Sequence, residues 1–191
     1  EEALKNDIHL ETSSAFDINI ISELHNRGMF DKDRFIVCNG YKNEIYLKNI
    51  YALRDKDFNN LIAILDNPEE IDKYKEHKQE LNIGLRIATE EEPNYAFYTS
   101  RLGMSSKRVL QLYNENIKDD SRFKLKMLHF FVNSGIKDTS YYWSELVRLI
   151  NVYCDMKEVC PELEYLDIGG GMPIYTSLGV EHDYAYMMDQ I

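Results

Sequence analysis

The sequence is poor in cysteine, proline and positive charge, and it contains no long apolar run. Its three cysteines, Cys38, Cys154 and Cys160, form no CxxC pair, which fits neither a zinc site nor a disulfide framework and predicts reduced thiols in a cytoplasmic protein. No apolar stretch reaches the roughly 20 residues that cross a bilayer, and no signal-peptide pattern is present. The net charge of −11 argues against nucleic acid and anionic membranes as partners, because both reward excess positive charge.

Nothing in the sequence marks a boundary between domains. There is no internal repeat, low-complexity tract or linker rich in proline and glycine, so we expect a single domain over residues 1–191. The chain begins at Glu1 rather than at methionine, and Ile191 falls inside an expected helix. We therefore expect both ends to be cut from a longer protein.

Short apolar runs alternate with longer amphipathic stretches along the chain. Each run is typical of a strand that is buried on both faces. The six expected strands are residues 8–10, 34–38, 61–65, 83–88, 125–132 and 165–168. The expected helices are residues 15–27, 44–53, 69–77 and 109–117, a long helix from 138 or 139 to about 156, and a last helix from about 183.

Two of these helices carry a distinct apolar stripe. Ile18, Ile21 and Leu24 recur at helical spacing in the first helix, and we expect Gly28 to end it. In the long helix, the expected buried stripe consists of Trp143, Leu146, Val147 and Ile150.

A β-α unit repeated six times predicts an α/β fold with parallel strands joined by right-handed crossovers. Such a sheet is either open and doubly wound or part of a barrel. A complete (β/α)8 barrel needs about 250 residues, so these units fill only part of one. A partial barrel has unpaired strand edges, from which we expect self-association.

The sharpest local signal is the stretch LDIGGGMP, which places Gly169, Gly170 and Gly171 directly after the last expected strand. Three glycines allow consecutive backbone N–H groups to turn toward one point and bind a phosphate. A tight turn that needs glycine only for its shape is the alternative. A nucleotide-binding methyltransferase-like domain has a similar loop, but after its first strand. Here five expected strands precede the loop, which favours a barrel, whose phosphate sites follow late strands.

This glycine stretch is similar to the phosphate-binding loop of fold-type III PLP-dependent decarboxylases, which have an alanine racemase-like PLP barrel. Four further stretches resemble the family in the same order: residues 10–14, 85–88, 100–104 and 128–135. A fifth, residues 36–42 (IVCNGYK), resembles the branch of biosynthetic arginine decarboxylases. The resemblance covers nearly the whole chain and implies a partial TIM-type barrel of about six β-α units.

The resemblance implies an enzyme that converts L-arginine to agmatine and CO2 in polyamine biosynthesis, with pyridoxal 5′-phosphate (PLP) as cofactor. It also implies a small basic amino acid as substrate, a homo-oligomer, and magnesium as a possible additional cofactor. We expect the family's Schiff-base lysine on a strand that precedes the first expected strand of this sequence. We expect the family's β-rich domain after the last expected strand. We therefore expect residues 1–191 alone to be inactive. A non-catalytic barrel homologue that binds partners or carries PLP is the alternative.

The resemblance assigns candidate residues to the cofactor's phosphate. Gly169, Gly170 and Gly171 would donate backbone N–H groups to it, and Ser134 would add its hydroxyl. For Ser134, a turn at the end of a strand is the alternative.

Candidate residues for the cofactor's ring lie on the fifth expected strand. Phe131 stands where most of the family has a histidine against the PLP ring, and a phenyl group can stack there but carries no charge. His129 would face the same way, one layer deeper, because residues i and i+2 of a strand share a face. Packing is the alternative for both. Glu11 matches an acidic family position without an assigned role, and no metal-ligand spacing is visible.

Overall fold

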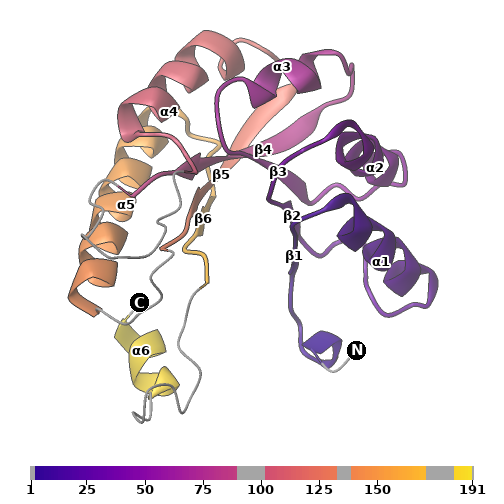
Figure 1. The fold of residues 1–191 in the computed structure, drawn as a ribbon, viewed down its shortest axis with the longest axis horizontal. Coiled ribbons are helices and arrows are strands. Elements are labelled where there is room, and N and C mark those ends of the chain that lie inside the picture. Colours follow the sequence, from indigo (N-terminus) through magenta and orange to yellow (C-terminus); the bar gives the residue numbers. More distant parts are fainter. Residues whose placement is uncertain (1–2, 90–101, 133–138, 171–182, 191) are drawn as a thin grey trace.

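The computed structural model describes residues 3–89, 102–132, 139–170 and 183–190. Their six strands form one sheet in the order β1-β2-β3-β4-β5-β6, and every neighbouring pair is parallel. The sheet curls, and helices α1 to α5 lie along its convex side (Figure 1). The strands are β1 (Leu10–Thr12), β2 (Ile36–Cys38), β3 (Leu61–Leu65), β4 (Leu81–Ile87), β5 (Phe123–Phe130) and β6 (Tyr165–Asp167).

The helices follow the strands in alternation. They are α1 (Ala15–Asn26), α2 (Glu44–Arg54), α3 (Glu70–Lys75), α4 (Ser106–Leu112), α5 (Thr139–Val159) and α6 (Tyr184–Gln190). A 3-10 turn, Ala3–Lys5, precedes β1, and a π-helical turn, Tyr113–Ile117, continues α4. The predicted alternation is confirmed, with each strand end within two residues of its predicted place.

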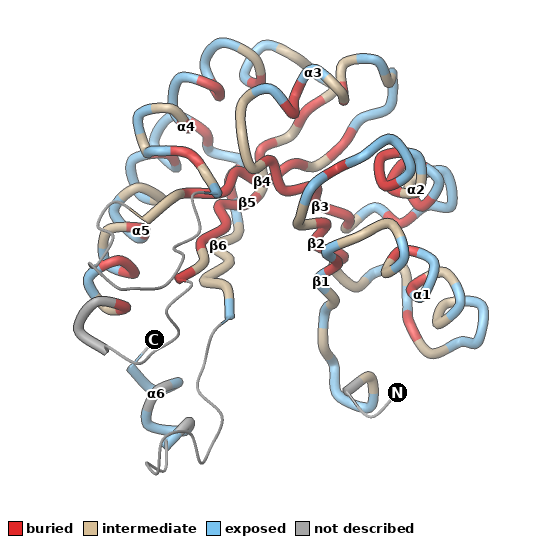
Figure 2. Tube along the Cα trace, viewed as in Figure 1, coloured by how far each residue is buried: buried red, intermediate tan, exposed pale blue. Residues whose placement is uncertain are grey.

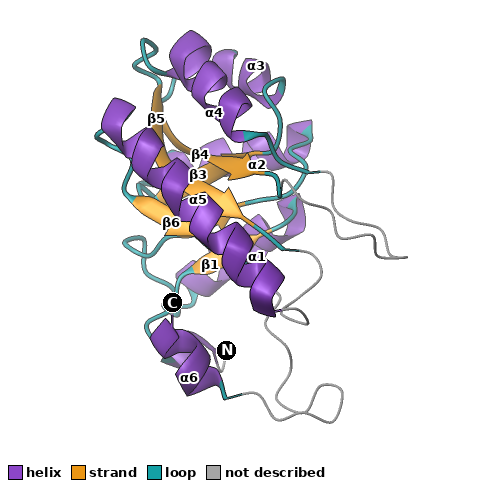
Figure 3. Ribbon diagram, turned by 90° about the vertical axis from the view of Figure 1, so that its left-hand side faces the viewer, coloured by secondary structure: helices purple, strands orange, loops and turns teal. Residues whose placement is uncertain are grey.

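Strand order and helix placement together define half of a barrel. An open doubly wound sheet has helices on both faces and a reversal in its strand order. In the described residues the order is sequential, and the helices α1 to α5 lie on one face, with α5 crossing the outer side of the strands in Figure 3. The predicted partial α/β barrel is therefore confirmed, and the methyltransferase-like alternative does not fit.

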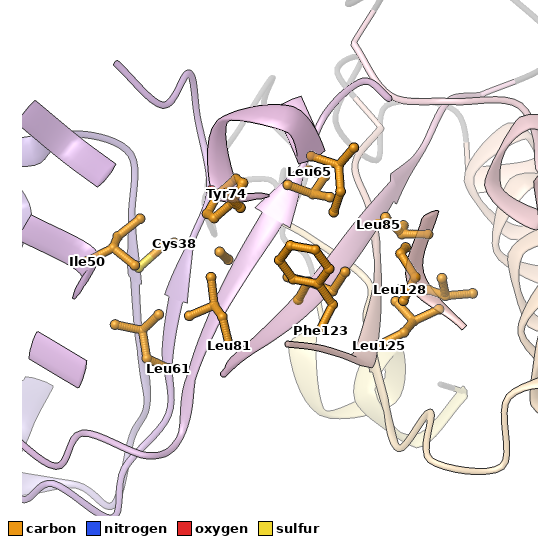
Figure 4. Packing of buried hydrophobic residues seen from close by; sticks show 14 of the residues in the cluster. Cys38, Ile50, Leu61, Leu65, Tyr74, Leu81, Leu85, Phe123, Leu125 and Leu128 are labelled. Carbon is orange, nitrogen blue, oxygen red and sulfur yellow. The ribbon is translucent and has the colours of Figure 1, made fainter. Parts of the chain in front are cut away.

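Alternate residues of each strand pack on opposite sides of the sheet. Those facing outward form a continuous apolar core with the helices, which includes Leu61, Leu81 and Leu128 (Figure 4). Those facing inward form a smaller apolar cluster of Val37, Ile62, Ile64 and Met127, and we call this inner side the lumen. Burial is concentrated along the strands, as the red tube in Figure 2 shows.

Local signals fix the helix ends as the sequence indicates. Gly28 adopts a left-handed conformation (φ +70°) just after α1, so the predicted stop is confirmed. The Asn43 side chain accepts a hydrogen bond from the Tyr46 N–H at 2.9 Å and caps α2. Ser105 caps α4 in the same way through the Arg108 N–H, at 3.3 Å.

The predicted stripe of the long helix is partly wrong. Leu146 is buried and Trp143 packs partly against the core, but Val147 is 56% exposed and Ile150 is 41% exposed. The buried face of the helix is therefore rotated about the helix axis from the predicted stripe, and other side chains occupy it. The residues that bury that face are Tyr142, Glu145, Leu146, Leu149 and Met156.

The structure also describes the three cysteines and the length of the apolar helices. Cys38 and Cys160 are buried, Cys154 is exposed, and all three are free thiols. Burial raises the pKa of the Cys38 thiol to about 11, which keeps it protonated. No helix within the described ranges is long and apolar enough to span a bilayer.

Candidate functional site

Polar side chains gather in the lumen where the strands end. Glu11 comes from β1, Asn39 follows β2, Arg86 comes from β4, His129 from β5 and Asp167 from β6. We call these five residues the lumen cluster. Strand register supports the grouping, because Arg86 pairs with His129 and His129 pairs with Asp167 across the sheet. Carboxyl ends of barrel strands are where this fold carries its active sites.

His129 is the centre of the lumen cluster. Its Nε2 lies 3.2 Å from Asn39 Nδ2, and 4.0 Å from both Glu11 Oε1 and Asp167 Oδ2. Asn39 Nδ2 also donates to Glu11 Oε1 at 2.8 Å. His129 is only 1% exposed, whereas the Glu11 side chain is 47% exposed. One buried imidazole thus links groups from the first and last strands of the arc.

Burial decides the charge of this histidine. Loss of hydration lowers the pKa of His129 from 6.5 to about 4, and the cations of Arg86 and Lys42 act in the same direction, against the pull of Glu11. Burial also raises the pKa of Asp167 above its ordinary value. At neutral pH the imidazole is therefore uncharged and faces two carboxyl groups.

Arg86 connects the lumen cluster to the aromatic ring predicted to face the cofactor. Its Nη1 lies 3.2 Å from Asp66 Oδ1, which fixes one side of the guanidinium. The guanidinium carbon lies 5.8 Å from the centre of the Phe131 ring. Phe131 directly follows β5 and is half-buried. The structure thus places Phe131 and His129 on the lumen side, with Phe131 nearer the carboxyl end.

A second charged pair lies beside the lumen cluster and is fully buried. The Lys42 ammonium donates to the backbone oxygen of Ile64 and lies 3.7 Å from Glu70 Oε2. Burial lowers the pKa of Lys42 and raises that of Glu70, and each charge opposes the shift of the other. The ammonium of this lysine therefore has two oxygen partners within the chain.

One glycine of the loop has a hydrogen-bond partner within the chain. Gly169 has φ +68°, and a Cβ there would lie 2.3 Å from the backbone oxygen of Phe130, so only glycine fits. Its N–H donates to Asp167 Oδ1 at 2.8 Å, and the binding of a phosphate by the three glycine amides stays a prediction. Gly170 has open space at its Cβ position. Gly171 and Ser134 lie outside the described residues.

The lumen cluster contains side chains that can ligate a metal, but they are not arranged for a metal ion. Ligand atoms of Glu11, His129 and Asp167 lie within 4.8 Å of one another, the one such group in the described ranges. However, the Asn39 amide nitrogen lies 2.8 Å from Glu11 Oε1 and 3.2 Å from His129 Nε2, so both side chains already have a hydrogen-bond partner where a metal ion would bind. The arrangement matches a hydrogen-bonded network better than a magnesium site.

Sequence reasoning found part of this site. It selected His129, Phe131 and the glycine loop, and it left Glu11 without a role. It gave no role to Asn39, Arg86 or Asp167, although all three lie in stretches that carry the family resemblance. Their common signal is position. Asp167 is the last residue of its strand, Arg86 is one residue before the end of its strand, and Asn39 directly follows its strand.

The chain belongs to the pyridoxal-dependent decarboxylases: the family described as "Pyridoxal-dependent decarboxylase, pyridoxal binding domain" matches residues 7–188. It is 26% identical over 160 residues to arginine decarboxylase 2 of Arabidopsis thaliana, a match that covers 79% of this chain and 22% of that protein.

Solved structures agree with this assignment. Lysine decarboxylase from Selenomonas ruminantium is 26% identical, with a TM-score of 0.74 over 97% of this chain and 46% of that chain. The structure of SrLDC in complex with PLP and cadaverine is 27% identical, with a TM-score of 0.70 over 95% and 43% of the two chains. The present chain thus spans less than half of each solved structure, and 22% of the curated plant relative.

Proposed function

We propose that this chain is the PLP-binding part of a decarboxylase that converts L-arginine to agmatine and CO2. One observation carries the proposal. The Phe131 ring, the turn at Gly169 and the carboxyl groups of the lumen cluster meet at the carboxyl ends of a half-barrel of the decarboxylase family. A role in polyamine biosynthesis, a cytoplasmic location and a homo-oligomer are parts of the same proposal.

The residues present fit the cofactor. Phe131 offers a half-buried phenyl face for offset stacking, and Gly170 offers an unobstructed backbone at the loop. The roles of Gly171 and Ser134 at the phosphate remain predictions. PLP, when bound, supplies an electron sink for the electron pair that is left when CO2 departs. The protein's part is to hold, orient and surround the reacting groups.

The charge of the lumen supports a basic amino acid as substrate. Glu11 and Asp167 bring carboxyl groups to one point, and the neutral His129 adds no positive charge between them. Such a surface attracts the cationic side chain of arginine or lysine. We favour arginine because residues 36–42 resemble the arginine branch and the plant relative is an arginine decarboxylase.

Substrate choice is tested with the protein at its full natural length. Arginine, lysine and ornithine are supplied separately with PLP, and the released CO2 and the amine product are measured. We expect kcat/KM for arginine to exceed that for lysine by about tenfold or more, since a buried polar contact separates such substrates. A preference for lysine would overturn the arginine assignment. Bound PLP without CO2 release from any of the three would favour the non-catalytic alternative.

The cofactor site is tested by removing the ring. Phe131→Ala should weaken PLP binding by about twofold to tenfold, which corresponds to the 0.5–1.5 kcal/mol of an aromatic pair. The matched control is Phe16→Ala, because Phe16 is 78% exposed on α1. Both affinities are read from the visible absorbance of bound PLP. Equal affinities in the two variants would remove the stacking role.

The lysine that binds PLP is predicted to lie outside residues 1–191. In the described residues the lumen cluster contains no lysine, and the Lys42 ammonium is held by Ile64 and Glu70. We therefore expect residues 1–191 alone to release no CO2 from arginine. Borohydride reduction of the full-length protein with PLP, followed by peptide mapping, should mark a lysine elsewhere. A pyridoxyl group on Lys42 would contradict this assignment.

A further inference from the structure

The side-chain amide of Asn39 is held in one orientation by its own loop. Asn39 directly follows β2, and its backbone N–H donates to the Thr12 backbone oxygen at 2.9 Å. Its backbone oxygen accepts from the Tyr46 hydroxyl at 3.0 Å. Its side-chain Oδ1 accepts from the Gly40 N–H at 2.8 Å, so the amide nitrogen is turned toward the lumen.

Two side-chain atoms lie within hydrogen-bond distance of that nitrogen. Asn39 Nδ2 lies 2.8 Å from Glu11 Oε1 and 3.2 Å from His129 Nε2. An amide NH2 group donates two hydrogen bonds and accepts none. His129 Nε2 must therefore present its lone pair, and the ring proton sits on Nδ1.

We propose that Asn39 is the positioning residue of the lumen cluster: it holds His129 as the neutral Nδ1–H tautomer and aims the Glu11 carboxylate at the same point. The opposite tautomer would set an Nε2–H against the N–H groups of Asn39, with no acceptor between them. This assignment does not depend on the proposed decarboxylation, because it concerns only hydrogen bonds within the chain.

Burial is the main cause of the neutral imidazole, and the surrounding charges act in both directions. Glu11 on β1 and Asp167 on β6 face His129 Nε2 at 4.0 Å, while the cations of Arg86 on β4 and Lys42 after β2 oppose its protonation. The ring is also 99% buried, since only 1% of the residue is exposed. Its Nδ1 has no hydrogen-bond partner in the described residues. In the proposed tautomer this atom is a buried N–H donor in the wall of the lumen.

The experiment is a tautomer measurement by NMR. The full-length protein is labelled with 15N-histidine, and two-bond 1H–15N correlations are recorded from pH 4 to pH 9, with His129→Gln to assign the signal. We expect the Nδ1–H tautomer at neutral pH, and a titration midpoint at least one pH unit below the ordinary 6.5. An Nε2–H tautomer or an imidazolium at neutral pH would overturn the proposal without any variant.

Variants then test whether Asn39 is the cause. Asn39→Asp replaces the donor by a carboxylate, so His129 should become an Nε2–H donor and its midpoint should rise by about one pH unit or more. Asn39→Ser removes the amide without adding charge and should leave a mixture of tautomers. The matched control is Asn59→Asp. Asn59 is exposed, and its side-chain Oδ1 accepts a hydrogen bond from Arg54 at 2.9 Å. An unchanged His129 signal in folded Asn39→Asp or Asn39→Ser would refute the assignment.

Discussion

The two faces of the sheet differ although the same strands form both. The outward face is mostly apolar and packs against the helices. The inward face has only a small apolar cluster and ends in charged and polar groups at the carboxyl ends of the strands. Because side chains alternate along a strand, neighbouring residues can serve stability and ligand binding separately. Phe130 and Phe131 are the sharpest example, since one is fully buried outward and the other half-buried toward the lumen.

The largest expected effect is on the outward face. Phe130→Ala should lower the free energy of unfolding by about 3–5 kcal/mol, because it opens a cavity in a fully packed core. The measurement is urea unfolding followed by circular dichroism. A loss below about 1 kcal/mol would show that the outward core is not what holds the sheet, given typical core values.

A similar effect is expected at the buried pair beside the lumen cluster. Lys42→Met leaves Glu70 buried without its cation, and breaking such a pair destabilises proteins by about 3–5 kcal/mol. The double variant Lys42→Met/Glu70→Gln should recover part of the loss, since no charge then remains unpaired. Lys48→Met, an exposed position on α2, is the control. If Lys42→Met and Lys48→Met have equal free energies of unfolding, the pair of Lys42 and Glu70 contributes nothing to stability.

A smaller effect is expected from pH. The folded pKa of His129 is about 4 and its ordinary value is 6.5, so between these pH values the unfolded chain binds a proton that the folded chain excludes. Stability should therefore fall on acidification through this window, by up to about 1.4 kcal/mol per pH unit. The raised pKa values of Glu70 and Asp167 act in the opposite direction, so the test is a difference between proteins.

That difference is measured on His129→Gln. The variant lacks the titrating ring, so its unfolding free energy should decline less than that of the parent between pH 6.5 and pH 4. Parallel declines would mean that His129 is protonated equally in both states, contrary to its burial.

The smallest effect on stability is expected at Phe131. Phe131→Ala should change the free energy of unfolding by about 1 kcal/mol or less, because the ring is only half-buried. The same variant is the one expected to lose cofactor affinity. A stability loss as large as that of Phe130→Ala would erase the division between the two faces.

Much of the fold could be predicted from the sequence because its signals are local. Runs such as Leu61–Leu65 are buried on both faces, and residues such as Ser105 and Gly28 mark helix ends. The stripe of α5 was partly wrong, because periodicity alone does not distinguish Val147 and Ile150 from the neighbours that face the sheet.

The candidate site could be predicted only in part because its contacts are not local. Asn39 and His129 are 90 residues apart in the chain and meet only because the sheet curls. The use of the Gly169 N–H by Asp167 is set by the conformation of the turn, which the glycine pattern does not specify. Spacing therefore identified the loop and the strand, but not the hydrogen-bonded cluster between them.

The most direct test is a crystal structure of the full-length protein with PLP. The account predicts the phosphate at the glycine loop after β6 and the pyridine ring against Phe131, on the lumen side of the strands. A cofactor bound on the convex, helix-covered side, or a ring remote from Phe131, would contradict it.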